Sequence, residues 1–517
     1  MPDPRKIKTP GVYVPEKMIF PNSVIQVSTA VPVFIGYTQK ANDGKQSLLN
    51  KATRITSLKQ YVQFFGSGQG VLLKFAITAA PTSWPVPNAP HVTINGGEQA
   101  VQANAPSFYL YNAIRLFFQN GGLACYIVAV GNYHETILLE HFKTGLSILL
   151  DQAEPSLLVM PDALLLPHDD FYALVQLALQ QCKEMGSIFY LVDVWGGSTM
   201  ADVNVIGSGS PLDVITDFRT NIGADALSYG AAYFPWLNTS VVSADEITFA
   251  NLPDLDTYIE TDASHQAAYH AVKTALLNAA YALLREDNAM HNEATIAAVQ
   301  QAHLALLAVS LNYKQLIAAA TAAANVQPAA GALAGVYVSN DLSKEVWKAP
   351  ANVNLAGVIK PTLYITDAVQ QILNVSTADG KSVNAIRTFP GRGVLVWGAR
   401  TLNGNSNEWR YISVKRTVMM IEQSAKQALL PYALQPNNAD TWMKVKDMMY
   451  NFLLGLWKQG AFVGTSPTDA FHVSVGLGTT MTAADISNGV LMLELMVAVT
   501  RPAEFIYIRI KQQMQKP

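Results

Sequence analysis

ACYIVAV, residues 124–130, is an apolar run with the length of one buried β-strand. It follows a helix predicted over 109–118, which the turn residues Asn120 to Gly122 end. The same pattern continues downstream, where a helix is predicted over 169–185. Three more apolar runs have the length of a strand, one before this helix and two after it: PSLLVM (155–160), SIFYLVDV (187–194) and YGAAYFP (229–235). Strands that alternate with helices indicate a partly parallel sheet with helical covers, in a mixed α/β or α+β fold.

The composition indicates a large protein that assembles with other copies. Its 517 residues predict roughly two to four domains. Only 14% are charged, against about 25% in a typical protein, so neighbouring subunits could cover much of the surface. A large, well-buried globule is the alternative. The net charge of -3 argues against nucleic-acid binding, which needs a concentrated basic face.

The sequence predicts a protein made in the cytoplasm. The first residues are polar and proline-rich, without the apolar core of an export signal. The longest apolar candidate, 490–499, is short and contains Glu494, which argues against membrane insertion. Cys125 and Cys182 have apolar neighbours, so we expect two buried thiols in a reducing compartment.

Both ends of the chain are predicted to be extended arms. Prolines between Pro2 and Pro21 disfavour helix, and a strand over 31–35 is expected to end at Gly36. From 505 to 511, isoleucines alternate with aromatic and basic residues, the period of a β-strand. Such an end can add a strand to a neighbouring subunit's sheet or pair within its own subunit. The arm residues that we expect to contact a neighbour are Val12, Tyr13, Val14, Val24, Val27, Phe505, Ile506, Tyr507, Ile508 and Ile510.

Between the arms, the chain divides by composition. An Ala- and Leu-rich stretch, 262–326, predicts two or three helices, with a break near 287–292. Turns and strands are expected over 328–400. The C-terminal part predicts helices over 411–429 and 439–459, then a strand over 472–478.

Motifs for catalysis, cofactors or metals are missing from the sequence, so we expect a protein that is not an enzyme. FGSGQGVLLKF (65–75) lacks the Lys-Ser/Thr end of a phosphate loop, and Gly207 to Pro211 fails the spacing of a hydrolase elbow. His168, Asp169 and Asp170 open a predicted helix, where acidic residues stabilise the N-terminus. The nine histidines form no HExxH motif.

Several segments resemble contractile tail sheath proteins, above all those of extracellular contractile injection systems such as antifeeding prophages. The most specific is AIRTFPGRGVLVWGARTL, 385–402, followed by EWRYISVKRT, 408–417. The other similar segments are PGVYVPE (10–16), VFIGYT (33–38), GALAGVYVSND (331–341), VWKAPAN (346–352), NFLLGLWKQGAFVG (451–464) and VAVTRPAEFI (497–506). The polar turn expected at SNDLSKE, 339–345, and the long helical stretch depart from the family pattern.

The resemblance implies a structural polymer without cofactors. Subunits would form hexameric rings stacked around an inner tube protein, with baseplate and terminal cap proteins at the ends, and contract to drive the tube through a target envelope. The sequence pattern and the resemblance together predict this division of the chain: an N-terminal arm and first core strand (1–38), a variable surface excursion (39–105), an α/β middle domain (106–261), a helical stretch (262–327), a C-terminal sheath core (328–500) and a C-terminal arm (501–517). The alternatives are an α/β enzyme with a helical subdomain and a capsid- or adhesin-like shell protein.

A sheath must also hold its tube. The predicted helix 439–459 carries Lys444, Lys446 and Asp447 beside an apolar side, and polar contacts that can be released suit a transient grip. A plain solvated helix face is the alternative interpretation.

Overall fold

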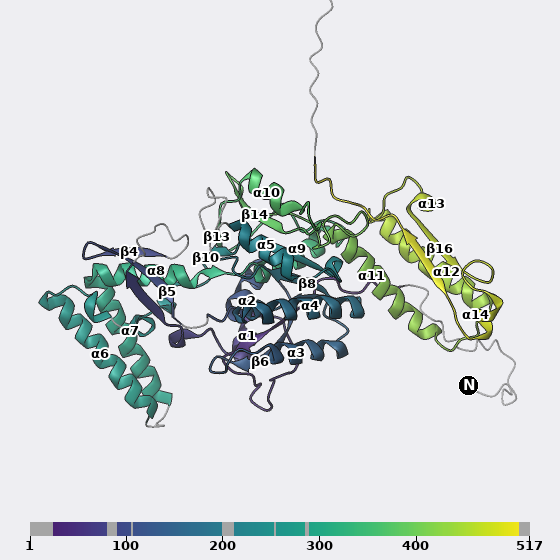
Figure 1. Cartoon of the computed structure of the whole chain (residues 1–517). Coiled ribbons are helices and arrows are strands. Elements are labelled where there is room, and N and C mark those ends of the chain that lie inside the picture. Colours follow the sequence, from purple (N-terminus) through teal and green to yellow (C-terminus); the bar gives the residue numbers. More distant parts are fainter. Residues whose placement is uncertain are drawn as a thin grey trace, which may run out of the picture. The chain divides into compact units, whose positions relative to one another are not determined.

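The computed structural model describes residues 24–79, 90–104, 107–198, 211–252, 255–284 and 289–505 (Figure 1). The chain forms two compact units, which are described separately: a larger one of residues 28–416 and 502–517, and a smaller one of residues 1–27 and 417–501. The finer division expected from composition stays a prediction.

A mixed sheet forms the centre of the larger unit. In the described residues it has nine strands, in the order β12-β15-β14-β9-β8-β7-β1-β6-β2. The middle six, from β14 to β6, run parallel, and antiparallel strands lie at both ends. The bounds are β1 (Pro32–Thr38), β2 (Thr53–Ile55), β6 (Cys125–Asn132), β7 (Leu157–Val159), β8 (Phe189–Asp193), β9 (Gly230–Phe234), β12 (Val353–Asn354), β14 (Asn384–Phe389) and β15 (Gly393–Trp397). The expected partly parallel α/β sheet is therefore confirmed. The first strand does not end at Gly36, however, but continues to Thr38.

Helices cover both faces of this sheet because its strands are apolar on both sides. On β1, Val33 and Ile35 belong to the core cluster that also holds residues of α3 and α4, which lie side by side (Figure 1). Phe34 points the other way, with its ring 5.4 Å from that of Phe117 on α2. The helices of this unit outside the insertion described below are α1 (Leu58–Phe65), α2 (Leu110–Gln119), α3 (Leu139–Ile148), α4 (His168–Met185), α5 (Pro211–Asn221), α9 (Ala330–Lys344) and α10 (Asp367–Asn374), with the start of α11 (Ile412–Leu429).

Helix α9 corrects the expectation of turns and strands after residue 328. The segment GALAGVYVSND and the expected turn SNDLSKE, except its last residue Glu345, form one continuous helix. Gly331 and Gly335 lie against α2: a Cβ on Gly331 would be 2.6 Å from the Ala113 Cα, and one on Gly335 would be 2.4 Å from the Phe117 carbonyl oxygen. Two helices can pack this closely only through glycine, and so tertiary contact outweighs the low helix propensity of these residues.

The Ala-rich stretch forms helices, as predicted: α6 (Ala263–Leu284), α7 (Ala289–Val309) and α8 (Leu311–Ala324). Helices α6 and α7 pack on each other, and α8 packs on a three-stranded sheet of β3 (Phe75–Ala79), β5 (Gly97–Ala103) and β4 (His91–Ile94) (Figure 1). Part of the predicted break near 287–292 falls outside the described residues.

Asn325 joins the two ends of this helical insertion. Its carbonyl oxygen accepts from the Thr239 N–H at 2.8 Å, in strand β10 (Leu237–Thr239), and its side chain bonds both the N–H and the carbonyl of Val242, at 2.9 and 2.8 Å. Strand β10 in turn pairs with β11 (Val326–Gln327) and β13 (Val358–Pro361). The chain therefore enters and leaves the insertion at one point of the larger unit.

The smaller unit contains most of α11, with α12 (Ala439–Lys458), α13 (Pro467–Ala470), α14 (Ala483–Ser487) and a hairpin of β16 (Phe471–Val475) and β17 (Leu493–Val497). The predicted C-terminal helices and the strand near 472 are thus confirmed. Among the described helices, none is by itself long and apolar enough to cross a membrane; by length and composition alone, the bent pair Ala297–Val309 and Leu311–Ala324 passes that test.

Candidate interaction surfaces

The β16–β17 hairpin presents strand edges to its surroundings. Its register runs from Phe471 opposite Val497 to Val475 opposite Leu493, and α12 packs on β16, with the Tyr450 and Phe471 rings 5.3 Å apart. In the described part of the chain this sheet has two strands, so each strand has one outer edge. A two-stranded sheet is marginally stable alone, and such an edge can pair with another strand.

Few of the predicted arm residues lie in the described part of the chain. Val24 and Val27 are partly exposed, and the Val27 N–H donates to the Ser424 Oγ on α11 at 3.0 Å. Phe505 is 65% exposed. Seven others lie outside the described residues: Val12, Tyr13, Val14, Ile506, Tyr507, Ile508 and Ile510. Their contacts stay predictions.

The three candidate tube-contact residues, Lys444, Lys446 and Asp447, lie on the exposed side of α12. The Lys444 ammonium pairs with the Asp440 carboxylate one turn earlier, 2.6 Å away. Met443, 60% exposed, lies on the same side. This face therefore combines charged pairs with apolar area, which suits a binding surface and a solvated face alike.

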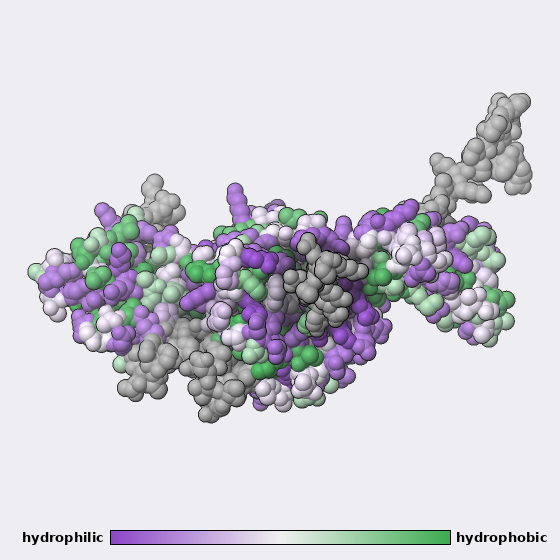
Figure 2. All heavy atoms as spheres, turned by 90° about the horizontal axis from the view of Figure 1, so that it is seen from above, coloured by the Kyte–Doolittle hydropathy of each residue, from purple (hydrophilic) through white to green (hydrophobic). Residues whose placement is uncertain are grey.

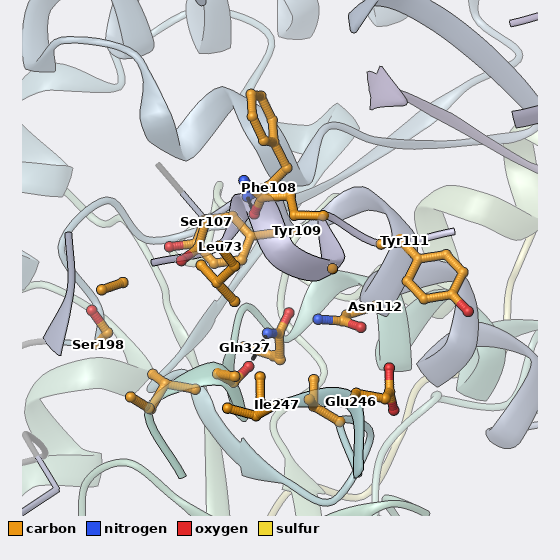
Figure 3. Close-up of a pocket in the computed structure, with 18 of the residues that line it drawn as sticks. Leu73, Ser107, Phe108, Tyr109, Tyr111, Asn112, Ser198, Glu246, Ile247 and Gln327 are labelled. Atoms are coloured by element: carbon orange, nitrogen blue, oxygen red, sulfur yellow. Dashed lines mark hydrogen bonds between the residues drawn. The ribbon is translucent and has the colours of Figure 1, made fainter. Parts of the chain in front are cut away.

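A cavity of about 170 Å³ lies in the larger unit between the start of α2, the end of α8 and the loop around Gly68 (Figure 3). Asn112 and Gln327 lie near each other there, and the Gln327 Oε1 lacks a hydrogen-bond partner among the described residues. Glu246 is the one carboxylate among the described lining residues, and Arg115 binds it at 2.9 Å. Among the described lining residues, Glu246 has no histidine or second carboxylate beside it that could form an acid–base pair.

His168 links two helices. Its Nδ1 lies 2.7 Å from the Asp169 carboxylate and its Nε2 lies 3.0 Å from that of Asp217 on α5, which also accepts from the Tyr172 hydroxyl. Hydrogen bonds that the His168 ring donates to the carboxylates of Asp169, first, and of Asp217 raise the pKa of His168. Within the described residues, no group of three or more His, Cys, Asp or Glu side chains could hold a metal ion. The cluster therefore joins α4 to α5.

Two buried carboxylates, which sequence reasoning missed, hold the starts of α2 and α9. Asp162 accepts from the N–H groups of Tyr37, Tyr109 and Leu110 at 2.8, 2.5 and 3.1 Å. Asp193, at the end of β8, accepts from those of Ala329 and Ala330 at 2.8 and 3.0 Å. Burial raises the pKa of Asp162 to about 6 and that of Asp193 to about 7, against the opposing effect of these N–H groups.

We expect Asp193→Asn to weaken the pH dependence of stability. Because the folded-state pKa lies above the ordinary value of about 4, the stabilisation from protonating Asp193 is fully present below pH 4 and is lost as the pH rises toward 7. Urea unfolding at pH 5 and pH 8 should therefore show a smaller loss of unfolding free energy in the variant. Asp151→Asn, at an exposed position, is the control. Equal losses in wild type and both variants would contradict this role of Asp193.

Hydrophilic and hydrophobic residues are interspersed on the face of the molecule shown in Figure 2. Comparison with known proteins identifies the class of protein that carries this surface. Residues 405–513 match the phage tail sheath C-terminal domain family. No curated protein sequence matches the chain. The helical sheath of the anti-feeding prophage in its contracted state is similar, with 25% identity and a TM-score of 0.58 over 98% of this chain and 100% of that chain. The chain is a tail sheath protein.

Two more solved structures are also similar over nearly their whole length. The contracted sheath complex of PVC, an extracellular contractile injection system, has 24% identity and a TM-score of 0.59, covering 98% of each chain. A chain of the 6-fold symmetrised anti-feeding prophage baseplate has 25% identity and a TM-score of 0.57, covering 98% of this chain and 100% of that one. The protein is therefore a contractile injection system sheath subunit, a structural protein and not an enzyme.

Proposed function

We propose that this sheath protein polymerises as stacked hexameric rings around an inner tube and contracts to drive the tube through a target envelope. The observation that carries the proposal is the match of 98% of the chain to subunits of contracted sheaths. Contraction would be driven by additional burial between subunits, at about 25 cal/mol for each Å² of apolar surface. The baseplate structure supports contact with baseplate proteins, and a terminal cap would close the other end. Made in the bacterial cytoplasm, the protein would act in a phage-tail-like extracellular particle.

The two arms would connect subunits by adding strands to a neighbour's sheet. We infer that the β16–β17 hairpin is the acceptor, because this sheet has two strands in the described part of the chain and an edge strand can pair with another chain. Each backbone hydrogen bond gained contributes about 0.5 to 1.5 kcal/mol net, so a short added strand supplies a few kcal/mol at each joint. Many joints acting together would hold the sheath while the larger units repack.

Removing either arm is expected to abolish sheath formation and leave a folded subunit, since the sheet and α12 need neither end. The deletions are residues 1–20 and residues 506–517, and the matched control removes only 514–517. Negative-stain microscopy after coexpression with the tube protein measures sheath length, and circular dichroism checks the fold. Sheaths of normal length from either arm deletion would contradict the arm model, and closed shells in place of tubes would favour a capsid-like protein.

The exposed side of α12 is the proposed tube contact. Lys444→Glu with Lys446→Glu should prevent sheath from forming on the tube, because reversed charges oppose a complementary tube surface. Lys59→Glu, on the exposed side of α1, is the matched control. Cosedimentation of sheath with preformed tube measures the effect. Unchanged cosedimentation of the double variant would show that this face of α12 is exposed to solvent and does not contact the tube.

A further inference from the structure

We propose that two buried arginine clamps in the larger unit hold the roots of both terminal arms, so that load on an arm passes into the large sheet. The chain passes between the units at 27–28, 416–417 and 501–502. A clamp lies within a few residues of each passage. The proposal rests on the proposed function only in assigning the arms to neighbouring subunits.

The first clamp holds the N-terminal root. The Arg416 guanidinium binds both Asp341 carboxylate oxygens, at 3.0 and 2.6 Å, and both side chains are only 3% exposed. The Thr29 carbonyl accepts from Arg416 at 2.7 Å, while its hydroxyl donates to Asp341 at 2.7 Å. Thr29 is thus fixed through its backbone and its side chain, one residue beyond the passage at 27–28.

The second clamp holds the C-terminal root. Arg400 binds both Glu504 carboxylate oxygens, at 3.0 and 2.7 Å, and its own side chain is 8% exposed. The same carboxylate accepts from the Tyr411 hydroxyl at 3.1 Å and from the Asn374 amide at 3.0 Å. The remaining Arg400 nitrogen donates to the Gly404 carbonyl at 2.9 Å. Three different segments of the core therefore hold the residue that begins the arm.

Both clamps meet on one short segment at the start of α11. Tyr411 contacts Glu504 and forms a β-bridge with Arg400, and Arg416 lies one and a half turns further on. Between them, the Lys415 ammonium lies 3.7 Å from the Tyr229 ring centroid and 4.6 Å from that of Trp409. Bidentate charged pairs are strong and geometrically specific, and burial protects them from screening by salt. The third passage, at 416–417, thus leaves from the same fixed segment.

The arrangement implies a path by which force on an arm reaches the larger unit. Force from a neighbouring subunit passes through Thr29 or Glu504 into the arginines and then into the large sheet. The Asn384 side-chain amide on β14 ties Arg400 to this sheet, because it donates to the Arg400 carbonyl and accepts from the Arg400 N–H, both at 2.8 Å. Residues 27–28 and 501–503 lie outside the clamps, and the third passage continues through helix α11. The arms can then transmit load without being pulled away from the sheet.

The C-terminal clamp can be tested by electron paramagnetic resonance distance measurement in the full chain. Nitroxide labels at Leu177→Cys on α4 and Phe505→Cys use exposed positions, 41% and 65%, while Cys125 and Cys182 are buried. Dilution with unlabelled chain removes distances between subunits. We expect one narrow distance distribution, lost on adding Glu504→Gln or Arg400→Lys and kept with the exposed control Glu408→Gln. A distance distribution that stays narrow in both clamp variants would overturn the proposed C-terminal clamp. So would a broad distribution in the labelled chain that carries neither substitution.

Hydrogen exchange tests the N-terminal clamp. Arg416→Lys should accelerate exchange of the peptide 28–31 while exchange in α2 stays unchanged; Thr29→Val gives a milder version that leaves the ion pair intact. Unchanged exchange in both variants would remove Thr29 from the proposal. These two measurements need no polymer. If the clamp variants show no effect but the arm deletions still abolish sheath formation, the clamp is wrong and the proposed function stands. If the clamp variants behave as expected but the arm deletions form normal sheaths, the clamp stands and the arm model is wrong.

Discussion

Gly335→Leu is expected to yield no folded larger unit. Even a Cβ at this position would lie 2.4 Å from the Phe117 carbonyl oxygen and 2.8 Å from the Asn120 Cβ, and α2 is backbone that cannot give way cheaply. Helix α9 would have to move off α2, which removes apolar burial on one face of the sheet. Overpacking by a few atoms costs about 1 to 3 kcal/mol, and leucine adds four carbons against a helix backbone. Soluble yield and thermal unfolding measure the loss.

Gly455 provides the matched control for this substitution. It lies in α12, and a Cβ there would meet nothing within 4 Å. Gly455→Ala should therefore stabilise the protein by about 0.5 to 1 kcal/mol through helix propensity. Gly335→Ala should instead destabilise it. Two alanine variants with the same sign of effect would show that propensity, not the contact between α2 and α9, decides the outcome.

Arg416→Met is expected to lower the free energy of unfolding by about 3 to 5 kcal/mol, because it leaves the Asp341 carboxylate buried without its partner. Adding Asp341→Leu should restore part of this loss, since an apolar pair of similar volume needs no compensating charge. Urea unfolding of the two single variants and the double variant gives the coupling free energy.

The exposed pair of Lys444 and Asp440 is the control for this cycle. Its side chains are 57% and 70% exposed, so Lys444→Met should change stability by at most about 1 kcal/mol. A loss at Arg416 no larger than that at Lys444 would show that the buried pair does not stabilise the larger unit.

Much of the fold could be predicted from local patterns. The apolar runs at 124–130 and 187–194 became β6 and β8 because a strand buried on both faces needs a continuous apolar sequence. The helices of 262–326 followed from composition. Helix α9 could not be predicted in this way, since its glycines are disfavoured in an isolated helix and are explained only by the backbone of α2.

The interaction sites were less predictable because their partners are distant in the sequence. From its neighbours in the sequence, Asp162 is expected to be a turn residue. Its hydrogen-bond donor, the Tyr37 N–H, lies 125 positions earlier in the sequence. Arg416 lies in a segment that the family resemblance highlighted, yet nothing nearby indicates that Asp341 and Thr29 are its partners. The arm residues were identified from period-two alternation, a local signal that says nothing about which chain supplies the other strand.

The bonds of Asn325 to Thr239 and Val242 have a practical consequence for engineering. A segment whose two ends meet at one place can be exchanged for a domain with neighbouring termini, because the chain enters and leaves it at the same point. Substitution of residues 243–324, with Asn325 retained, would thus offer a grafting position for display of foreign proteins on an injection particle.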